Sequence, residues 1–116
     1  MAAVTEEALI TQTVLDYFEG WFDGDAARMD RALHRDLVKR RSGDELGVTP
    51  KERMVELTER GEGRRVATGG RIGVEIEDVY EDIASVTVHA PPYHEYLHLV
   101  RTSDGWRIAN ALWREA

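Results

Sequence analysis

Residues 93–113 read YHEYLHLVRTSDGWRIANALW, and this stretch predicts the element around which the rest of the fold is arranged. Apolar and polar residues alternate on both sides of Ser103-Asp104-Gly105, which is the period of a β-strand. An Asp-Gly pair is typical of a tight turn, because glycine adopts the left-handed backbone conformation that such turns need. The stretch therefore predicts a β-hairpin.

Both faces of this hairpin carry apolar side chains. A three-residue turn at 103–105 would place Thr102 opposite Trp106 and His98 opposite Asn110, whereas a two-residue turn would change these partners. One face then carries Tyr96, His98, Val100, Ile108, Asn110 and Leu112, and the other carries Leu97, Leu99, Ala109, Ala111 and Trp113. We expect helices and a pocket to cover one face and a second subunit the other, since large exposed apolar surfaces mark interaction sites. The polar members of the first face favour the pocket.

The chain before the hairpin begins with helices and continues with strands. Apolar residues recur at three- and four-residue spacing between Leu9 and Trp21, which predicts an amphipathic helix with Thr5 as its N-cap. Gly24 is predicted to end this helix. Further elements are predicted as a helix at 26–33, a strand at 34–41, a helix from Thr49 to Gly61, and strands at 71–78 and 83–89.

Two segments carry strong local signals. Thr49-Pro50-Lys51-Glu52 matches a capping box, with Thr49 as the N-cap and proline in the first helical position. Residues 42–48 and the glycine-rich residues 61–70 are predicted to be loops. Helices followed by antiparallel strands indicate an α+β fold, in which a curved sheet carries about three helices on one face. Residues 1–116 are predicted to form a single domain.

Composition excludes several classes of protein. The chain has 116 residues, no cysteine and a net charge of −7, with 42% hydrophobic residues. The missing cysteines exclude disulfides and thiolate chemistry, and the acidic charge disfavours nucleic acid as a partner. We predict a cytoplasmic protein without a membrane partner, because the apolar runs are short and the first residues lack a signal-peptide pattern. No cofactor is predicted. A metal site is not predicted either, since His94 and His98 lie about 13 Å apart on a strand, too far to share a metal ion.

Histidines and two adjacent cations are the other candidates for chemistry. His98 and Asn110 form the best polar pair, for catalysis, ligand binding or simply mutual satisfaction in the core. His34 follows the second helix, where it would cap carbonyl groups or contact a ligand. Lys39 and Arg40 point opposite ways in an extended chain, so at most one enters the fold, where it would bind an anionic or enol oxygen.

Several motifs together resemble one family. They are YFEGWFDGD at 17–25, RALHRDLVKR at 31–40, TPKERMVELT at 49–58 and DGWRIANALW at 104–113. The chain resembles the putative lumazine-binding, SnoaL-like branch of the nuclear-transport-factor-two-like superfamily. That resemblance implies a cone-shaped, cystatin-like α+β roll with a strongly bent antiparallel sheet, an interior pocket and a homodimer.

The resemblance does not imply one reaction, because this superfamily includes both enzymes and binding proteins. By similarity to the ketosteroid isomerases, Tyr17 would bind a developing oxyanion, but the chain has no clear match to their catalytic aspartate. Asp78 is the one acid on the apolar phase of its strand and would serve as a base if it were buried.

We therefore predict a protein that binds a flat, partly apolar small molecule, heteroaromatic or polyketide-like. The candidate ligand-binding residues are Tyr17, Trp21, His34, Arg40, Tyr96, His98, Asn110 and Trp113, although Trp113 would suit the subunit interface equally. One alternative is a cofactor-free isomerase, cyclase or dehydratase with His98 or Asp78 as base and Tyr17 as oxyanion donor. The other alternative is a non-catalytic dimeric interaction module whose pocket is filled by its own side chains.

Overall fold

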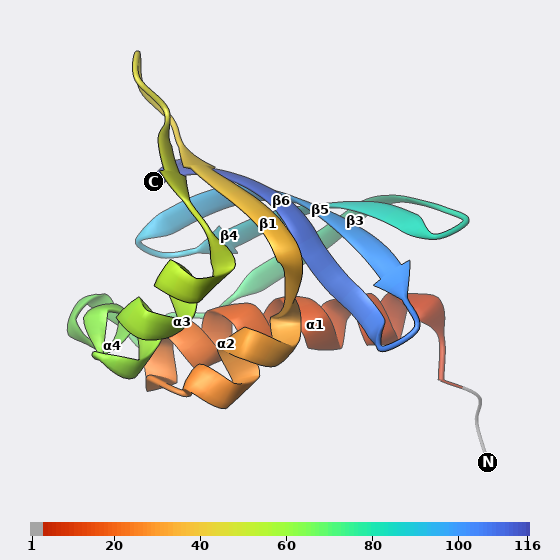
Figure 1. Cartoon of the computed structure of the whole chain (residues 1–116), viewed down its shortest axis with the longest axis horizontal. Coiled ribbons are helices and arrows are strands. Elements are labelled where there is room, and N and C mark those ends of the chain that lie inside the picture. The colour runs from red at the N-terminus through yellow and green to blue at the C-terminus, as the bar shows by residue number, and fades with distance from the viewer. Residues whose placement is uncertain (1–3) are drawn as a thin grey trace.

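The computed structural model describes residues 4–116 and consists of a curled sheet above a layer of helices (Figure 1). The elements, in chain order, are α1 (Glu6–Asp23), α2 (Ala26–Ala32), β1 (Leu33–Arg41), β2 (Gly47–Thr49), α3 (Lys51–Glu59), α4 (Glu62–Val66), β3 (Gly73–Tyr80), β4 (Ile83–Ala90), β5 (Tyr93–Thr102) and β6 (Gly105–Glu115). No helix within residues 4–116 is long and apolar enough to cross a membrane.

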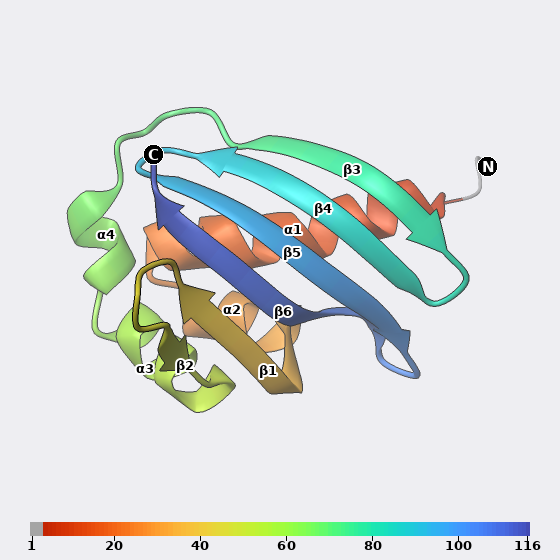
Figure 2. The same ribbon diagram turned by 90° about the horizontal axis from the view of Figure 1, so that it is seen from above.

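The six strands form one open sheet in the order β2-β1-β6-β5-β4-β3. Its concave side faces α1, and its other side is free of helices (Figures 1 and 2). The predicted α+β class with a bent sheet and helices on one face is confirmed. The sheet is antiparallel except where β1, which lies second from one edge, runs parallel to β6.

The first helix follows its predicted boundaries. The side-chain oxygen of Thr5 accepts a hydrogen bond from the backbone N–H of Ala8 at 3.1 Å, as expected of an N-cap. Gly24 ends α1 in the left-handed conformation, with φ of 71°. The predicted strand after α2 is also present, as β1.

Two local predictions are wrong. Thr49 does not cap α3, because it pairs with Lys39 as the last residue of the short strand β2, and Pro50 becomes the N-cap without a side-chain bond.

Residues 62–66, predicted to be loop, form α4 against α1. Gly63 permits that contact, since a Cβ there would lie 2.6 Å from Cγ of Trp21.

This close approach gives a prediction for stability. We expect Gly63→Ala to lower the free energy of unfolding by about 1–3 kcal/mol, because the new methyl group overlaps Trp21 and forces α4 away from α1. The control is Gly47→Ala, where the nearest atom to the new Cβ would be 3.9 Å away. Urea unfolding of both variants checks this, and equal stabilities would contradict the packing described for α4.

The hairpin turn also differs from the prediction. Thr102 pairs with Gly105 and Arg101 pairs with Trp106, so the turn has two residues rather than three. A β-bulge at Ala109 then adds one residue to β6. The bulge restores the predicted pairing of His98 with Asn110, while Ile108 moves to the opposite face and becomes fully buried.

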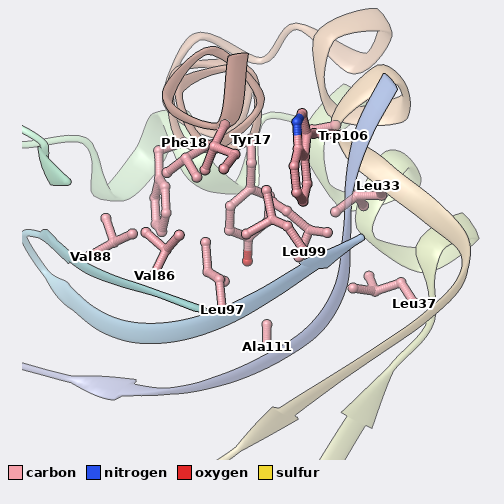
Figure 3. Close-up of a cluster of buried hydrophobic side chains, with 14 of the residues drawn as sticks. Tyr17, Phe18, Leu33, Leu37, Val86, Val88, Leu97, Leu99, Trp106 and Ala111 are labelled. Atoms are coloured by element: carbon pink, nitrogen blue, oxygen red, sulfur yellow. The ribbon is translucent and has the colours of Figure 1, made fainter. Parts of the chain in front are cut away.

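The core lies between α1 and the concave face of the sheet (Figure 3). Tyr17 and Phe18 project from α1 onto Val86, Leu97 and Leu99 of the central strands. Trp106 closes one end, where its indole N–H donates to a carboxylate oxygen of Glu6 at 2.6 Å. This core fixes the position of Tyr17, whose hydroxyl points away from α1 towards the strands (Figure 3).

Candidate functional site

An interior cavity of about 100 Å³ lies between the concave face of the sheet and the helices. It is lined by Tyr17, Phe18, Trp21, Lys39, Thr49, Met54, Leu57, Tyr93, Glu95 and Trp113. Helices α1 and α3 supply one wall, and strands β1, β5 and β6 supply the other. Among the predicted site residues, the structure brings Tyr17, Trp21 and Trp113 together here.

Three polar side chains meet inside this apolar cavity. The hydroxyl of Tyr17 donates to a carboxylate oxygen of Glu95 at 2.9 Å, and it accepts from the ammonium group of Lys39. The Lys39 nitrogen also lies 3.8 Å from the second carboxylate oxygen of Glu95. Only 8% of Lys39 and 2% of Glu95 are exposed, so this pair is almost completely removed from water. We call these three residues the buried triad.

Burial shifts the protonation equilibria of the buried triad. Desolvation raises the pKa of Glu95 and lowers the pKa of Lys39, and in each case the opposite charge of the other residue only partly offsets it. Desolvation, together with the nearby charge of Glu95, raises the pKa of the Tyr17 hydroxyl well above its usual value. The shifts bring the pKa values of Lys39 and Glu95 closer together, and they keep the Tyr17 hydroxyl protonated between them.

Aromatic rings surround the open side of the buried triad. The indole N–H of Trp21 donates to the Tyr93 hydroxyl at 3.1 Å, and the Tyr93 ring meets the Trp113 ring edge-on at 5.4 Å. The Lys39 nitrogen lies 5.3 Å from the centre of the Trp113 ring. Lys39 and Tyr17 therefore share one cavity with these aromatic rings.

Sequence reasoning left Lys39 undecided and did not single out Glu95. The structure decides between the two adjacent cations, since Lys39 is buried and Arg40 is exposed on the other face of β1. A signal for Glu95 was present, because it shares the two-residue phase of the core residues Leu97 and Leu99. A carboxylate on the buried phase of a strand requires a partner inside the fold.

The structure places the other predicted site residues outside the interior cavity. Tyr96, His98 and Asn110 project from the convex face of the sheet, which we call the outer face, together with Arg40. Alternation along β5 gives the reason, since Glu95, Leu97 and Leu99 take the inward positions. His98 and Asn110 do meet, with 3.4 Å between Nδ1 of His98 and Nδ2 of Asn110, but at an exposed position. The expectation that this pair lines the interior is therefore corrected.

The sheet separates two groups that were expected to act together. Asp78 and His98 line one hollow of about 400 Å³ on the outer face, whereas Tyr17 lines the interior cavity on the other side of the sheet. Neither Asp78 nor His98 shares a cavity with Tyr17, so neither can act as the base in a reaction for which Tyr17 is the oxyanion donor. His34 lies in neither place, because its Nδ1 accepts from the backbone N–H of Asp36 at 3.0 Å, beside the start of β1.

Solved structures with the same architecture define the class of the fold. An NTF2-like protein of unknown function from Silicibacter pomeroyi has a TM-score of 0.75 and 18% identity, with 100% of each chain covered. A cystatin-like fold protein from Burkholderia xenovorans has a TM-score of 0.66 and 18% identity, covering 92% of this chain and 91% of that one. A ketosteroid isomerase-like protein from Erwinia carotovora atroseptica has a TM-score of 0.63 and 19% identity, covering 97% and 98%. The fold is that of the NTF2-like superfamily.

Within that superfamily, a family model described as "Putative lumazine-binding" matches residues 5–114. The chain belongs to this family. The match spans all the helices and nearly the whole sheet, and it includes the three residues of the buried triad. No curated protein sequence matches the chain.

Proposed function

We propose that the interior cavity binds a flat, partly apolar small molecule, whose oxygen-bearing end contacts Lys39 and Tyr17. The observation that carries this proposal is a buried lysine and a buried hydroxyl that line an apolar, aromatic cavity. A protein interior rarely keeps such groups next to open space, and small-molecule sites combine apolar walls with a few polar groups in this way. The family's description supports a ligand of this kind.

The size of the cavity decides how the ligand is held. At about 100 Å³ it is smaller than the roughly 300 Å³ of typical small-molecule pockets, and an apolar cavity of about 150 Å³ accepts benzene. We infer that only the end of a ring is enclosed beside the buried triad. The remainder of a larger flat molecule lies between Trp21, Tyr93 and Trp113 at the entrance.

The hydrogen-bond donors of the buried triad determine which chemical group of the ligand fits in the cavity. Lys39 and Tyr17 both offer N–H or O–H donors, and Glu95 already accepts from Tyr17. A carbonyl, enol or phenol oxygen matches these donors. A second positive charge would be repelled by Lys39, so cationic ligands are excluded by this account.

Matched tyrosine variants test this proposal. We expect Tyr17→Phe to weaken binding by about tenfold, since it removes one hydrogen-bonding hydroxyl from the cavity. Tyr96→Phe makes the same chemical change on the outer face and should leave affinity unchanged. Isothermal titration with benzoate, phenol and lumazine measures both. Equal losses in the two variants, or no binding of any of the three compounds to the parent protein, would contradict the proposal.

We also propose that a second copy of the chain covers the outer face. Several large side chains project there although they are between 44% and 68% exposed: Tyr80, Ile83, Tyr96 and Leu112. They follow one another across the sheet from β3 to β6, around hollows of about 400 and 820 Å³. An apolar sheet face of this kind is typical of an interface.

The distribution of charge supports a copy of the same chain as the partner. Arg40 and Arg114 lie on the outer face at the β1–β6 side, and Glu75 and Asp78 lie on it at the β3 side. A two-fold axis along the central strands brings the cationic side of one copy over the acidic side of the other. Such self-complementarity is what a two-fold interface requires.

A further inference from the structure

Lys39 combines two properties that a nucleophilic lysine needs, namely removal from water and direct access to a cavity. The chain contains two lysines, Lys39 and Lys51. The Lys51 ammonium binds the carbonyl oxygen of Leu33 at 3.1 Å and lies 3.4 Å from a carboxylate oxygen of Asp30, at the edge of the fold. Lys39 instead lines the interior cavity, and within residues 4–116 its one paired carboxylate is that of Glu95.

We propose that Lys39 forms a reversible imine with a ketone or aldehyde that enters the interior cavity. This inference rests on the proposed function, and it narrows the class of ligand to carbonyl compounds. Amines attack carbonyl carbon only in the neutral form, so the site must remove a proton from the lysine and later supply one to the departing oxygen. The buried triad contains groups in position for both transfers.

The hydrogen bonds of the buried triad run in one direction, from Lys39 through Tyr17 to Glu95. Lys39 donates to the Tyr17 hydroxyl, and that hydroxyl donates to Glu95 at 2.9 Å. A proton leaves the ammonium group when Tyr17 accepts it and passes its own proton to the carboxylate. The product is a neutral amine beside a neutral acid, and the apolar surroundings lower the free energy needed to form it from the buried ion pair. The lowered pKa of Lys39 and the raised pKa of Glu95 agree with this direction.

The covalent step balances with the groups at the site. The amine nitrogen of Lys39 attacks the carbonyl carbon, and one N–H proton moves to the carbonyl oxygen, giving a carbinolamine. The carboxylic acid of Glu95 then donates its proton, through Tyr17, to the carbinolamine hydroxyl, which leaves as water. The nitrogen lone pair forms the C=N bond. The cationic imine and the Glu95 carboxylate remain as an ion pair, and addition of water reverses the reaction.

The cavity also restricts which carbonyl compounds fit. About 100 Å³ around the Lys39 nitrogen accepts the carbonyl and a few neighbouring atoms. Aromatic rings at the entrance favour an apolar, flat remainder. A ketone or aldehyde on a small ring satisfies both conditions, and we choose cyclopentanone as the probe.

Reductive trapping of the unmodified protein tests this inference. The protein is incubated with cyclopentanone and sodium cyanoborohydride, which reduces an imine to a stable amine, and the sites of labelling are mapped by peptide mass spectrometry. Lys51 and the N-terminal amine serve as internal controls in the same sample. We expect labelling at Lys39 to exceed that at Lys51 by about tenfold at neutral pH, because Lys39 can pass its proton through Tyr17 to Glu95 and burial lowers its pKa. Labelling at Lys51 and the N-terminus without Lys39 would overturn the proposal.

The pH dependence gives a second readout. The ratio of Lys39 to Lys51 labelling should rise as the pH falls from about 9 to about 6, because Lys39 can pass its proton to Glu95 within the buried triad, whereas an amine in water loses about tenfold of its neutral form per pH unit. A constant ratio would contradict an activated lysine. Lys51→Arg is expected to leave Lys39 labelling unchanged.

Binding of the non-covalent ligands of the tyrosine test to the parent protein distinguishes a failed inference from a failed proposed function. Lys39→Arg is the negative control for the covalent step, because it has no nucleophilic amine and should lose cyclopentanone labelling at position 39. If the parent protein binds those ligands but Lys39 is never labelled, the imine proposal falls and the binding site stands.

Discussion

Lys39→Met is expected to lower the free energy of unfolding by about 3–5 kcal/mol, because it leaves the carboxylate of Glu95 buried without its cation. Methionine has nearly the length of lysine, so little volume is lost. The cost is therefore electrostatic. Urea unfolding of the parent and the variant at neutral pH measures it.

The double variant Lys39→Met/Glu95→Met separates charge from packing. Replacing a whole buried ion pair with apolar side chains is often neutral or stabilising. We therefore expect the double variant to be more stable than Lys39→Met alone. If the second substitution adds a further loss, Glu95 contributes through packing rather than as the partner of Lys39, and the account of the buried triad is wrong.

The single variant should also depend on pH in a defined direction. Burial already raises the pKa of Glu95 above its ordinary value of 4.5, and loss of Lys39 removes the main interaction that lowers it. The folded state then holds a proton that the unfolded state releases, so stability falls as the pH rises above about 4.5. The Lys39→Met variant is expected to be more stable at mildly acidic pH than at neutral pH. Unfolding curves at both pH values check this.

Leu112→Asp is expected to weaken self-association by about 100-fold or more, because two-fold symmetry places the new charge in the interface twice. Leu112 is 44% exposed on the outer face, and Leu9 on α1 has the same exposure. Leu9→Asp is thus a matched control on the helical side, and it should remain dimeric. Analytical ultracentrifugation at micromolar concentration measures all three proteins. A monomeric parent protein, or equal dissociation of both variants, would contradict the proposed interface.

Much of the fold could be predicted because its signals are local. Thr5 and Gly24 mark the ends of α1 by backbone chemistry that does not depend on the rest of the chain. The cap at Thr49 and the loop at 61–70 were predicted wrongly because tertiary contacts decide them. Pairing with Lys39 draws Thr49 into β2, and the close approach of Gly63 to Trp21 lets a glycine-rich segment pack as α4.

The candidate site was harder to predict because it depends on which face of a strand turns inwards. The bulge at Ala109 puts Ile108 and Asn110 on opposite faces of β6, although they are two residues apart. Regular alternation without a bulge puts Ile108 on the same face as His98 and Asn110. That face was predicted to line the interior because polar side chains suit a pocket better than a flat apolar interface. Tyr17 and Trp21 were placed correctly because a single helix fixes their common face.

The three tryptophans report most directly on where a ligand binds. Trp21 and Trp113 line the interior cavity, whereas Trp106 is buried elsewhere against Glu6. The measurement is a titration of the ¹⁵N-labelled protein with lumazine, followed through the three indole N–H signals and the side-chain amide of Asn110. If the interior cavity is the binding site, the signals of Trp21 and Trp113 move while those of Trp106 and Asn110 stay in place. Movement of the Asn110 signal, with Trp21 and Trp113 unchanged, would place the ligand on the outer face and contradict the account.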